Sequence, residues 1–263
     1  MSRREVSGGS GLVGQVFQPV RFNSPRTWPA DANPDPRPVV LSPTHVSDHR
    51  YIAMSTIVVV RKNGRVAIGA DTLAKDGYTM QRASLVANHS KIVRVADSFL
   101  AYTGSGAWGS VLPHYFDSCK RPPRLDTVAG IFQTVTRMHP VLKRRYGVNA
   151  YDSEKDFETS RLNLLIANPH GAFGVYGQRS VAEFTTFYAF GAGSHFALGA
   201  MHVAFQLIDD PAEIARLGVE AASEFDEDTA LPSEVHTIRM AKKRGGSDDQ
   251  VTRTPVGLNG ARH

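Results

Sequence analysis

The stretch STIVVVRKNGRVAIGAD, residues 55–71, decides the fold of this chain. Two apolar runs flank Asn63-Gly64, a dipeptide that tolerates the positive φ angles of a tight turn, so the stretch predicts a β-hairpin. The run before the turn, residues 56–62, is as long as the run after it, residues 65–71. The outer ends of the two strands must therefore be neighbours, which places Ser55 close to Asp71.

Ser55 follows Met54 directly, and this order has a chemical meaning. A serine hydroxyl is a weak nucleophile at neutral pH and needs a base close by. An α-amino group is such a base, because its pKa of roughly 7.7–8.0 lies near neutral pH. If translation starts at Met54 and the methionine is removed, Ser55 carries hydroxyl and amine together and is a candidate N-terminal nucleophile. Two alternatives stay open: an ordinary strand that begins at this serine, and Thr56 as nucleophile after loss of both preceding residues.

Composition excludes several classes of protein. Of the 263 residues 41% are hydrophobic, which is enough for a globular core. No apolar run approaches the roughly 20 residues that span a bilayer, and no apolar signal stretch follows the start MSRR, so we expect no membrane partner. Cys119 is the one cysteine, which excludes an internal disulfide and a cysteine-rich metal site and suits the reducing cytoplasm. We expect neither a metal nor a cofactor.

The charge gives little reason to expect a nucleic-acid partner. The net charge is +5 and the pI is 9.4. Residues 1–53 hold six basic and four acidic residues, residues 242–263 hold five and two, and residues 54–241 hold nineteen of each. The basic excess lies at the two ends, and no zinc-finger, RNP or helix-turn-helix pattern accompanies it.

The same division indicates the domain organisation. Residues 1–53 hold seven of the fifteen prolines without any periodic pattern. We therefore expect residues 1–54 to be an unstructured leader, a propeptide or the product of a start codon assigned too far upstream. Residues 55–241 form the folded domain, and residues 242–263 are expected to be an unstructured basic tail.

Apolar patterns predict the other elements of the domain. Strands are expected at residues 91–95, 99–103, 162–167, 172–176, 183–190 and 235–240. Helices are expected between Ala107 and Cys119 and at residues 124–145, 194–207 and 211–222. The apolar face of the second holds Val128, Ile131, Phe132, Val135, Met138 and Leu142. The apolar face of the third includes Phe196 and Val203 and can pack within one subunit or between two. This order predicts an α+β fold, a four-layer αββα sandwich of two antiparallel sheets between helix layers.

Lys91 stands at the start of the strand that follows the hairpin. In that position its ammonium can lie between the Ser55 hydroxyl and the Asp71 carboxylate. An ammonium beside an alcohol stabilises the alkoxide, and a carboxylate keeps the ammonium charged and in place. The alternative is a surface ion pair, which contributes little to stability.

Residues 55–240 resemble the proteasome β-type subunits, in particular the bacterial forms that include the ATPase-partnered heat-shock peptidase and the betaproteobacterial proteasome homologue. The hairpin of residues 56–71 is similar to the opening hairpin of that family. KIVRV at 91–95 and FLAYTGSG at 99–106 resemble its lysine strand and the strand after it, and FGAGSHFALGA at 190–200 resembles the entry to its third helix. The resemblance implies the N-terminal nucleophile hydrolase fold.

The resemblance also implies roles for single residues. Ser55 matches the catalytic N-terminal residue, Asp71 the acid that orients the lysine, and Lys91 the lysine that lowers the pKa of the hydroxyl. The backbone N–H of Gly104 or Ser105 matches the oxyanion donor. Asp226 and Thr229 match the acid and hydroxyl that support the terminal amine, although residues 224–229 also suit a solvated helix end.

The chain departs from the family at two positions that bear on activity. The family usually has threonine where this chain has Ser55, and serine lacks the methyl group that fixes the rotamer. The serine of the Gly-Ser-Gly turn is Ala192 here, which leaves Ser194 as a substitute.

The function predicted from these residues is a proteasome-like peptidase subunit. The resemblance implies stacked rings whose active sites face an inner chamber, unfolded proteins or peptides as substrates, and an ATPase unfoldase as partner. A small-molecule amidase of the same nucleophile class and a catalytically silent ring-forming scaffold are the alternatives.

Overall fold

The computed structural model describes residues 55–148 and 157–241. The predicted leader, residues 1–54, and the predicted tail, residues 242–263, lie outside the described residues. Among the described residues, no helix is long and apolar enough to cross a membrane.

The helices and strands follow the predicted order, with one added hairpin and one predicted strand divided in two. The strands are β1 (Thr56–Lys62), β2 (Arg65–Asp71), β3 (Ala74–Asp76), β4 (Thr79–Gln81), β5 (Ile92–Val95), β6 (Ser98–Thr103), β7 (Asn163–Asn168), β8 (Gly171–Val175), β9 (Val181–Phe184), β10 (Phe187–Gly191) and β11 (Ser233–Arg239). The helices are α1 (Trp108–Asp117), α2 (Val128–Tyr146), α3 (Ser194–Leu207) and α4 (Pro211–Phe225), with one 3-10 turn at Ala83–Leu85.

The opening hairpin is present as predicted. Strands β1 and β2 are antiparallel, and Ile57 lies opposite Ala70 in their register. The turn residues Asn63 and Gly64 have φ angles of 50° and 68°, which is the conformation that this dipeptide tolerates best. The hairpin forms the centre of a four-stranded sheet with the order β10-β1-β2-β11.

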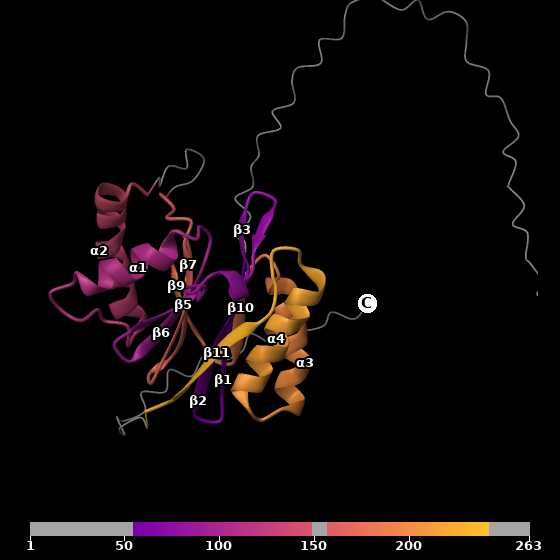
Figure 1. Cartoon of the computed structure of the whole chain (residues 1–263). Coiled ribbons are helices and arrows are strands. Elements are labelled where there is room, and N and C mark those ends of the chain that lie inside the picture. The colour runs from indigo at the N-terminus through magenta and orange to yellow at the C-terminus, as the bar shows by residue number, and fades with distance from the viewer. Residues whose placement is uncertain (1–54, 149–156, 242–263) are drawn as a thin grey trace, which may run out of the picture. The chain divides into compact units, whose positions relative to one another are not determined.

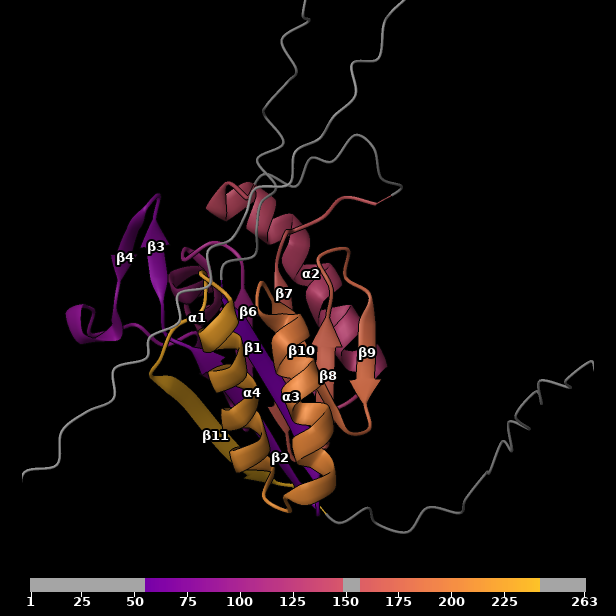
Figure 2. The same cartoon turned by 90° about the vertical axis from the view of Figure 1, so that its right-hand side faces the viewer.

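A second sheet, of order β5-β6-β7-β8-β9, packs against the first. Figure 1 shows four layers, with α1 and α2 outside the second sheet and α3 and α4 outside the first. Figure 2 shows α3 and α4 lying across the strands of the first sheet. The predicted αββα sandwich of antiparallel sheets is therefore confirmed.

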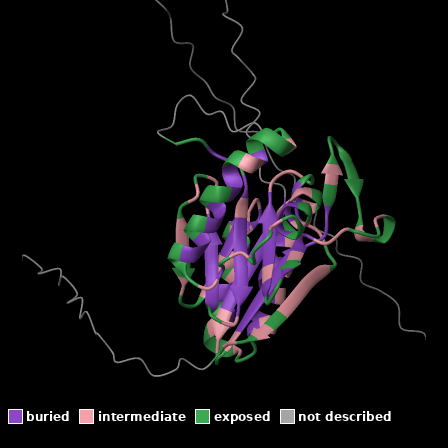
Figure 3. Ribbon diagram, turned by 90° about the vertical axis from the view of Figure 1, so that its left-hand side faces the viewer, coloured by how far each residue is buried: buried purple, intermediate pink, exposed green. Residues whose placement is uncertain are grey.

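Strand β1 is apolar along most of its length because both of its faces are covered. Ile57 and Val59 lie in the core between the two sheets. Val58 and Val60 point the other way and pack under α3 and α4. Side chains alternate across a strand, so one continuous apolar run serves two cores. Figure 3 shows the resulting buried strands, with exposed residues gathered on the helices and on the β3–β4 hairpin.

The predicted strand at residues 183–190 is wrong as a single element. The chain leaves β9 in one sheet and enters β10 in the other, so the break at Thr185 and Thr186 carries it between the layers. The backbone N–H of Arg61 donates to the Thr186 carbonyl at 2.5 Å at this crossing. Both halves carry similar aromatic residues, and a local pattern cannot show which sheet each half joins.

Within the single chain, the apolar faces of two helices are buried only in part. In α3, Phe196 and Val203 are 44% and 58% exposed, and the buried residues are instead Ala197, Met201 and Ala204. The small alanines allow α3 to approach its neighbours closely, and a helix that is apolar on most sides gives no single stripe to choose. In α2, Val128 and Phe132 are exposed at the edge of the predicted apolar face, whereas its other members, Ile131, Val135, Met138 and Leu142, are buried.

Candidate active site

The Asp71 carboxylate is the fixed centre of the site. Asp71 ends β2 and is fully buried, and its Oδ1 accepts the backbone N–H of Thr56 at 2.9 Å. Its Oδ2 accepts the backbone N–H groups of Leu73 at 3.0 Å and Ala230 at 3.4 Å. The hairpin brings Thr56 opposite Asp71, so the first of these bonds follows from the strand register.

Lys91 completes a buried ion pair with Asp71. The Lys91 Nζ donates to Asp71 Oδ1 at 2.8 Å and to Oδ2 at 2.9 Å, and the lysine is 7% exposed. Burial lowers the pKa of Lys91 below its ordinary value, and the neighbouring Asp71 carboxylate opposes part of that shift. The Lys91 ammonium therefore releases its proton more readily than a solvated lysine does.

Ser55 and Lys91 line the same cavity, which has a volume of about 300 Å³ and which we call the Ser55 cavity. Its lining also includes Tyr102, Gly104 and Gly106. Ser55 is 5% exposed, and its carbonyl oxygen accepts the backbone N–H of Ala192 at 2.9 Å. Ser55 and Lys91 thus border a shared space that is large enough for part of a substrate.

Gly191 allows the chain to hold Ser55 in this place. Its φ angle is +108°, which L side chains rarely adopt. A Cβ at this position would lie 1.8 Å from the Ser55 carbonyl oxygen. Only glycine therefore permits β10 to pass this close to Ser55.

Thr56 has a supporting place in the structure. Its hydroxyl is fully buried, lies 2.7 Å from the Thr229 hydroxyl and accepts the backbone N–H of Gly193 at 3.1 Å. Thr229 Oγ1 in turn donates to Asp226 Oδ2 at 2.5 Å. The predicted pair of Asp226 and Thr229 thus contacts residue 56, directly beside Ser55. The hydroxyl of Thr56, the alternative nucleophile, thus already has two hydrogen-bond partners in the same chain.

Comparison with solved structures identifies the family. The structure titled Thiobacillus denitrificans BPH, a bacterial proteasome homologue, is 47% identical to this chain and superposes with a TM-score of 0.67. The match covers 71% of this chain and 98% of the Thiobacillus protein. This chain belongs to the bacterial proteasome homologues. The resemblance found in the hairpin and the lysine strand is thereby confirmed.

Two further structures match this proteasome homologue. Thiobacillus denitrificans BPH in complex with Epoxomicin is 46% identical, with a TM-score of 0.67 and coverage of 71% of this chain and 100% of that one. Eukaryotic HslV from Trypanosoma brucei is 21% identical, with a TM-score of 0.49 and coverage of 70% and 99%. No family model matches the sequence, and no match is found among curated proteins.

The remaining predicted site residues lie in different places. Gly104, at the end of β6, lines the Ser55 cavity, whereas Ser105 lines a neighbouring pocket and accepts the backbone N–H of Ala107 at 3.3 Å. Ser194 begins α3, and within residues 55–148 and 157–241 no hydrogen bond joins its hydroxyl to Ser55. The structure therefore provides no support for Ser194 as a substitute for the missing serine at Ala192.

Sequence reasoning missed one ion pair at the wall of the cavity. Lys75 Nζ lies 2.5 Å from Asp228 Oδ1, and this hydrogen bond raises the pKa of Lys75. The pair ties β3 to the loop that carries Thr229. The partners are 153 residues apart, and neither stands in a local pattern that would have pointed to the other.

Proposed function

We propose that this proteasome homologue is a peptidase subunit that hydrolyses peptide bonds with Ser55 as its N-terminal nucleophile. The observation that carries the proposal is that Ser55 and Lys91 line one cavity, with Lys91 held by the buried Asp71. The 47% identity to Thiobacillus denitrificans BPH over nearly the whole of that protein supports the same reaction class.

The proposed reaction begins once residues 1–54 are removed and Ser55 has a free amine. The Ser55 hydroxyl attacks the carbonyl carbon of the substrate, and its proton passes to the α-amine. The Lys91 ammonium, positioned by Asp71, stabilises the negative charge on the attacking oxygen. The C–N bond then breaks, the leaving amine takes the proton, and an ester to Ser55 remains. Water hydrolyses the ester and restores the hydroxyl.

Backbone N–H groups of the 104–107 loop are the proposed oxyanion donors. Gly104 and Gly106 line the Ser55 cavity at the end of β6. We assign the donor to the backbone N–H of Gly104 or Ser105, which would face the oxygen on which charge develops in the tetrahedral intermediate. A substitution cannot remove a backbone N–H. The test is therefore a structure with a bound inhibitor, which would show which backbone N–H contacts the inhibitor oxygen.

The subunit is proposed to act inside a ring-shaped homo-oligomer. Large apolar side chains lie exposed on α3 and just after α4, including Val203 at 58%, Leu207 at 79% and Leu231 at 46%. Apolar surface of this kind is typical of protein–protein contacts. Sedimentation velocity of the purified chain is expected to show a closed oligomer, and a monomer at micromolar concentration would refute this part.

The proposed substrates are unfolded proteins and short peptides, delivered in the cytoplasm by an ATPase unfoldase. No metal, cofactor, nucleic acid or membrane takes part in the proposed reaction. Because the related Thiobacillus protein was solved with epoxomicin, we expect the same compound to bind this chain. A ligand that binds the folded state raises the melting temperature, so a thermal shift with epoxomicin measures this directly.

The decisive experiment compares two starting points and two variants. The chain expressed from Met54 and the full chain are purified, their N-termini are read by intact mass, and turnover of unfolded casein and of short peptides is measured. We expect turnover only where the mass begins at Ser55. The Ser55→Ala variant is expected to lose it, and the exposed Ser110→Ala is the matched control.

The same experiment separates the two alternatives. Equal turnover by the Ser55→Ala variant and by the wild type, or no turnover by a protein that begins at Ser55, would favour the silent scaffold. The replacement of the family serine by Ala192 is the observation in favour of that alternative. Cleavage of one compact amide without cleavage of any peptide would favour the amidase.

A further inference from the structure

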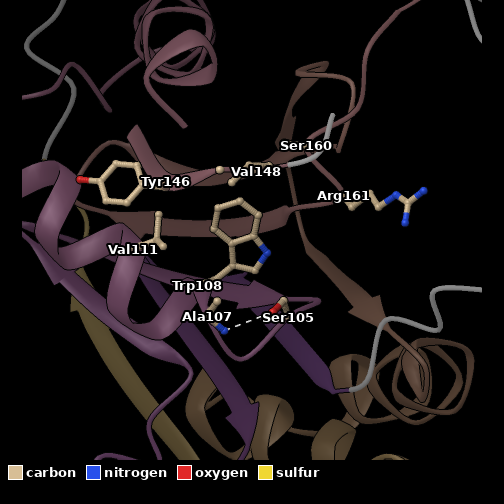
Figure 4. A pocket seen from close by; sticks show the side chains of 9 residues that line it. Ser105, Ala107, Trp108, Val111, Tyr146, Val148, Ser160 and Arg161 are labelled. Atoms are coloured by element: carbon tan, nitrogen blue, oxygen red, sulfur yellow. Dashed lines mark hydrogen bonds between the residues drawn. The ribbon is translucent and has the colours of Figure 1, made fainter. Parts of the chain in front are cut away.

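A second cavity lies on the other side of the 104–107 loop from the Ser55 cavity. It measures about 250 Å³, and we call it the Trp108 pocket; its lining residues include Trp108, Val111, Tyr146 and Val148. Figure 4 shows the Trp108 ring in the middle, with Tyr146 and Val111 on one side and Arg161 on the other. The volume is below the roughly 300–1,000 Å³ of sites for small molecules, and it suits a single side chain.

The loop is the shared wall of the two cavities. Gly104 and Gly106 line the Ser55 cavity, while Ser105 and Ala107 line the Trp108 pocket. A Cβ at Gly104 would lie only 3.4 Å from the indole nitrogen of Trp108. The wall is therefore one residue thick, and a peptide bound at Ser55 needs to extend by only a few residues to reach the pocket, since an extended chain advances about 3.3 Å per residue.

Trp108 presents a hydrogen-bond donor without an acceptor. The residue is 5% exposed, and no hydrogen bond from its indole N–H is found within the described part of the chain. The indole nitrogen is not among the buried polar atoms of the described residues that lack a partner, so it keeps contact with solvent at the pocket. A ligand that enters the pocket can therefore accept its N–H without displacing a bond within the protein.

We propose that the Trp108 pocket is a second substrate subsite, which takes a large apolar side chain of the bound peptide while a peptide carbonyl accepts the indole N–H of Trp108. This inference rests on the proposed function. The aromatic and aliphatic lining favours phenylalanine or leucine over alanine, by about tenfold or more in kcat/KM, because burial of such a side chain is favourable. A basic side chain is disfavoured, because Arg161 also lines the pocket and like charges repel.

The test is a peptide series in which one residue at a time, on both sides of the cleaved bond, is phenylalanine, leucine, alanine or aspartate. The full chain, processed to Ser55, is compared with Val148→Phe, which fills the pocket, and with Trp108→Phe, which removes the donor and keeps a ring. Val128→Phe, at an exposed position outside the pocket, is the matched control. The readout is the ratio of kcat/KM between phenylalanine and alanine peptides, so that differences in the amount of active protein cancel.

We expect one position at which the wild type and Val128→Phe prefer the apolar residue. At that position Val148→Phe loses the preference, and Trp108→Phe raises KM by about fivefold, the effect of one neutral hydrogen bond. A wild type without apolar preference, or a Val148→Phe variant that keeps it, overturns the inference while leaving the peptidase proposal intact. A wild type with a free Ser55 amine that cleaves no peptide overturns both.

Discussion

Replacing Asp71 by asparagine tests the centre of the site with an almost unchanged shape. Each oxygen of the Asp71 carboxylate accepts at least two hydrogen bonds: one faces Thr56 N and Lys91 Nζ, and the other faces Leu73 N, Ala230 N and Lys91 Nζ. In either orientation the asparagine amide puts an NH₂ group against donors. The substitution also leaves the buried Lys91 without its counter-charge.

The magnitude follows from these contacts. Removal of one partner from a buried ion pair costs about 3–5 kcal/mol, because an uncompensated charge or an unsatisfied polar group remains. For a chain of this size each kcal/mol moves the melting temperature by about 2–4 °C, so Asp71→Asn is expected to melt about 6–20 °C below the wild type. Peptide turnover is expected to fall with it, because Lys91 is no longer held in place.

Urea unfolding followed by circular dichroism at one fixed protein concentration measures the free energy of unfolding. The exposed Asp76→Asn is the matched control and is expected to change stability by less than about 0.5 kcal/mol. The double variant Asp71→Asn with Lys91→Met removes the stranded charge, so its loss should be smaller than the sum of the two single losses by about 1–3 kcal/mol. A single Asp71→Asn loss below about 1 kcal/mol, or strict additivity in the double variant, would refute the buried ion pair.

Three further predictions concern neighbouring residues. Gly191→Ala should destabilise the fold by about 2–4 kcal/mol in urea unfolding, since its Cβ has no room, whereas Gly199→Ala on an open helix position should be neutral or stabilising. Thr229→Val should cost about 1–3 kcal/mol of stability and lower kcat more than it changes KM, because a buried hydroxyl disappears and its carboxylate partner is left without the bond; unchanged kcat would argue against a positioning role. Burial lowers the pKa of Lys91 in the folded state, so the unfolded chain binds more protons as the pH approaches the ordinary lysine pKa of about 10.4. The stability of the wild type relative to Lys91→Met should therefore rise with pH up to that value, and a flat or falling difference would contradict this.

The opening hairpin and its chemistry were accessible from the sequence because their geometry is local. Asn63-Gly64 sets the turn, and equal strand lengths then bring Thr56 opposite Asp71 whatever the rest of the chain does. Lys91 directly precedes β5, and its ammonium reaches both carboxylate oxygens.

The rest of the site depends on contacts between distant segments, and only the tertiary structure decided them. The Thr229 hydroxyl meets Thr56 across 173 residues, and Lys75 meets Asp228 across 153. The buried side of α3 and the crossing between β9 and β10 were set by which neighbours pack closely, not by periodicity. Backbone preferences act over a few neighbouring residues, so the sequence predicts them directly. Burial and ion pairing depend on which distant segments pack together, so they are determined only in the folded chain.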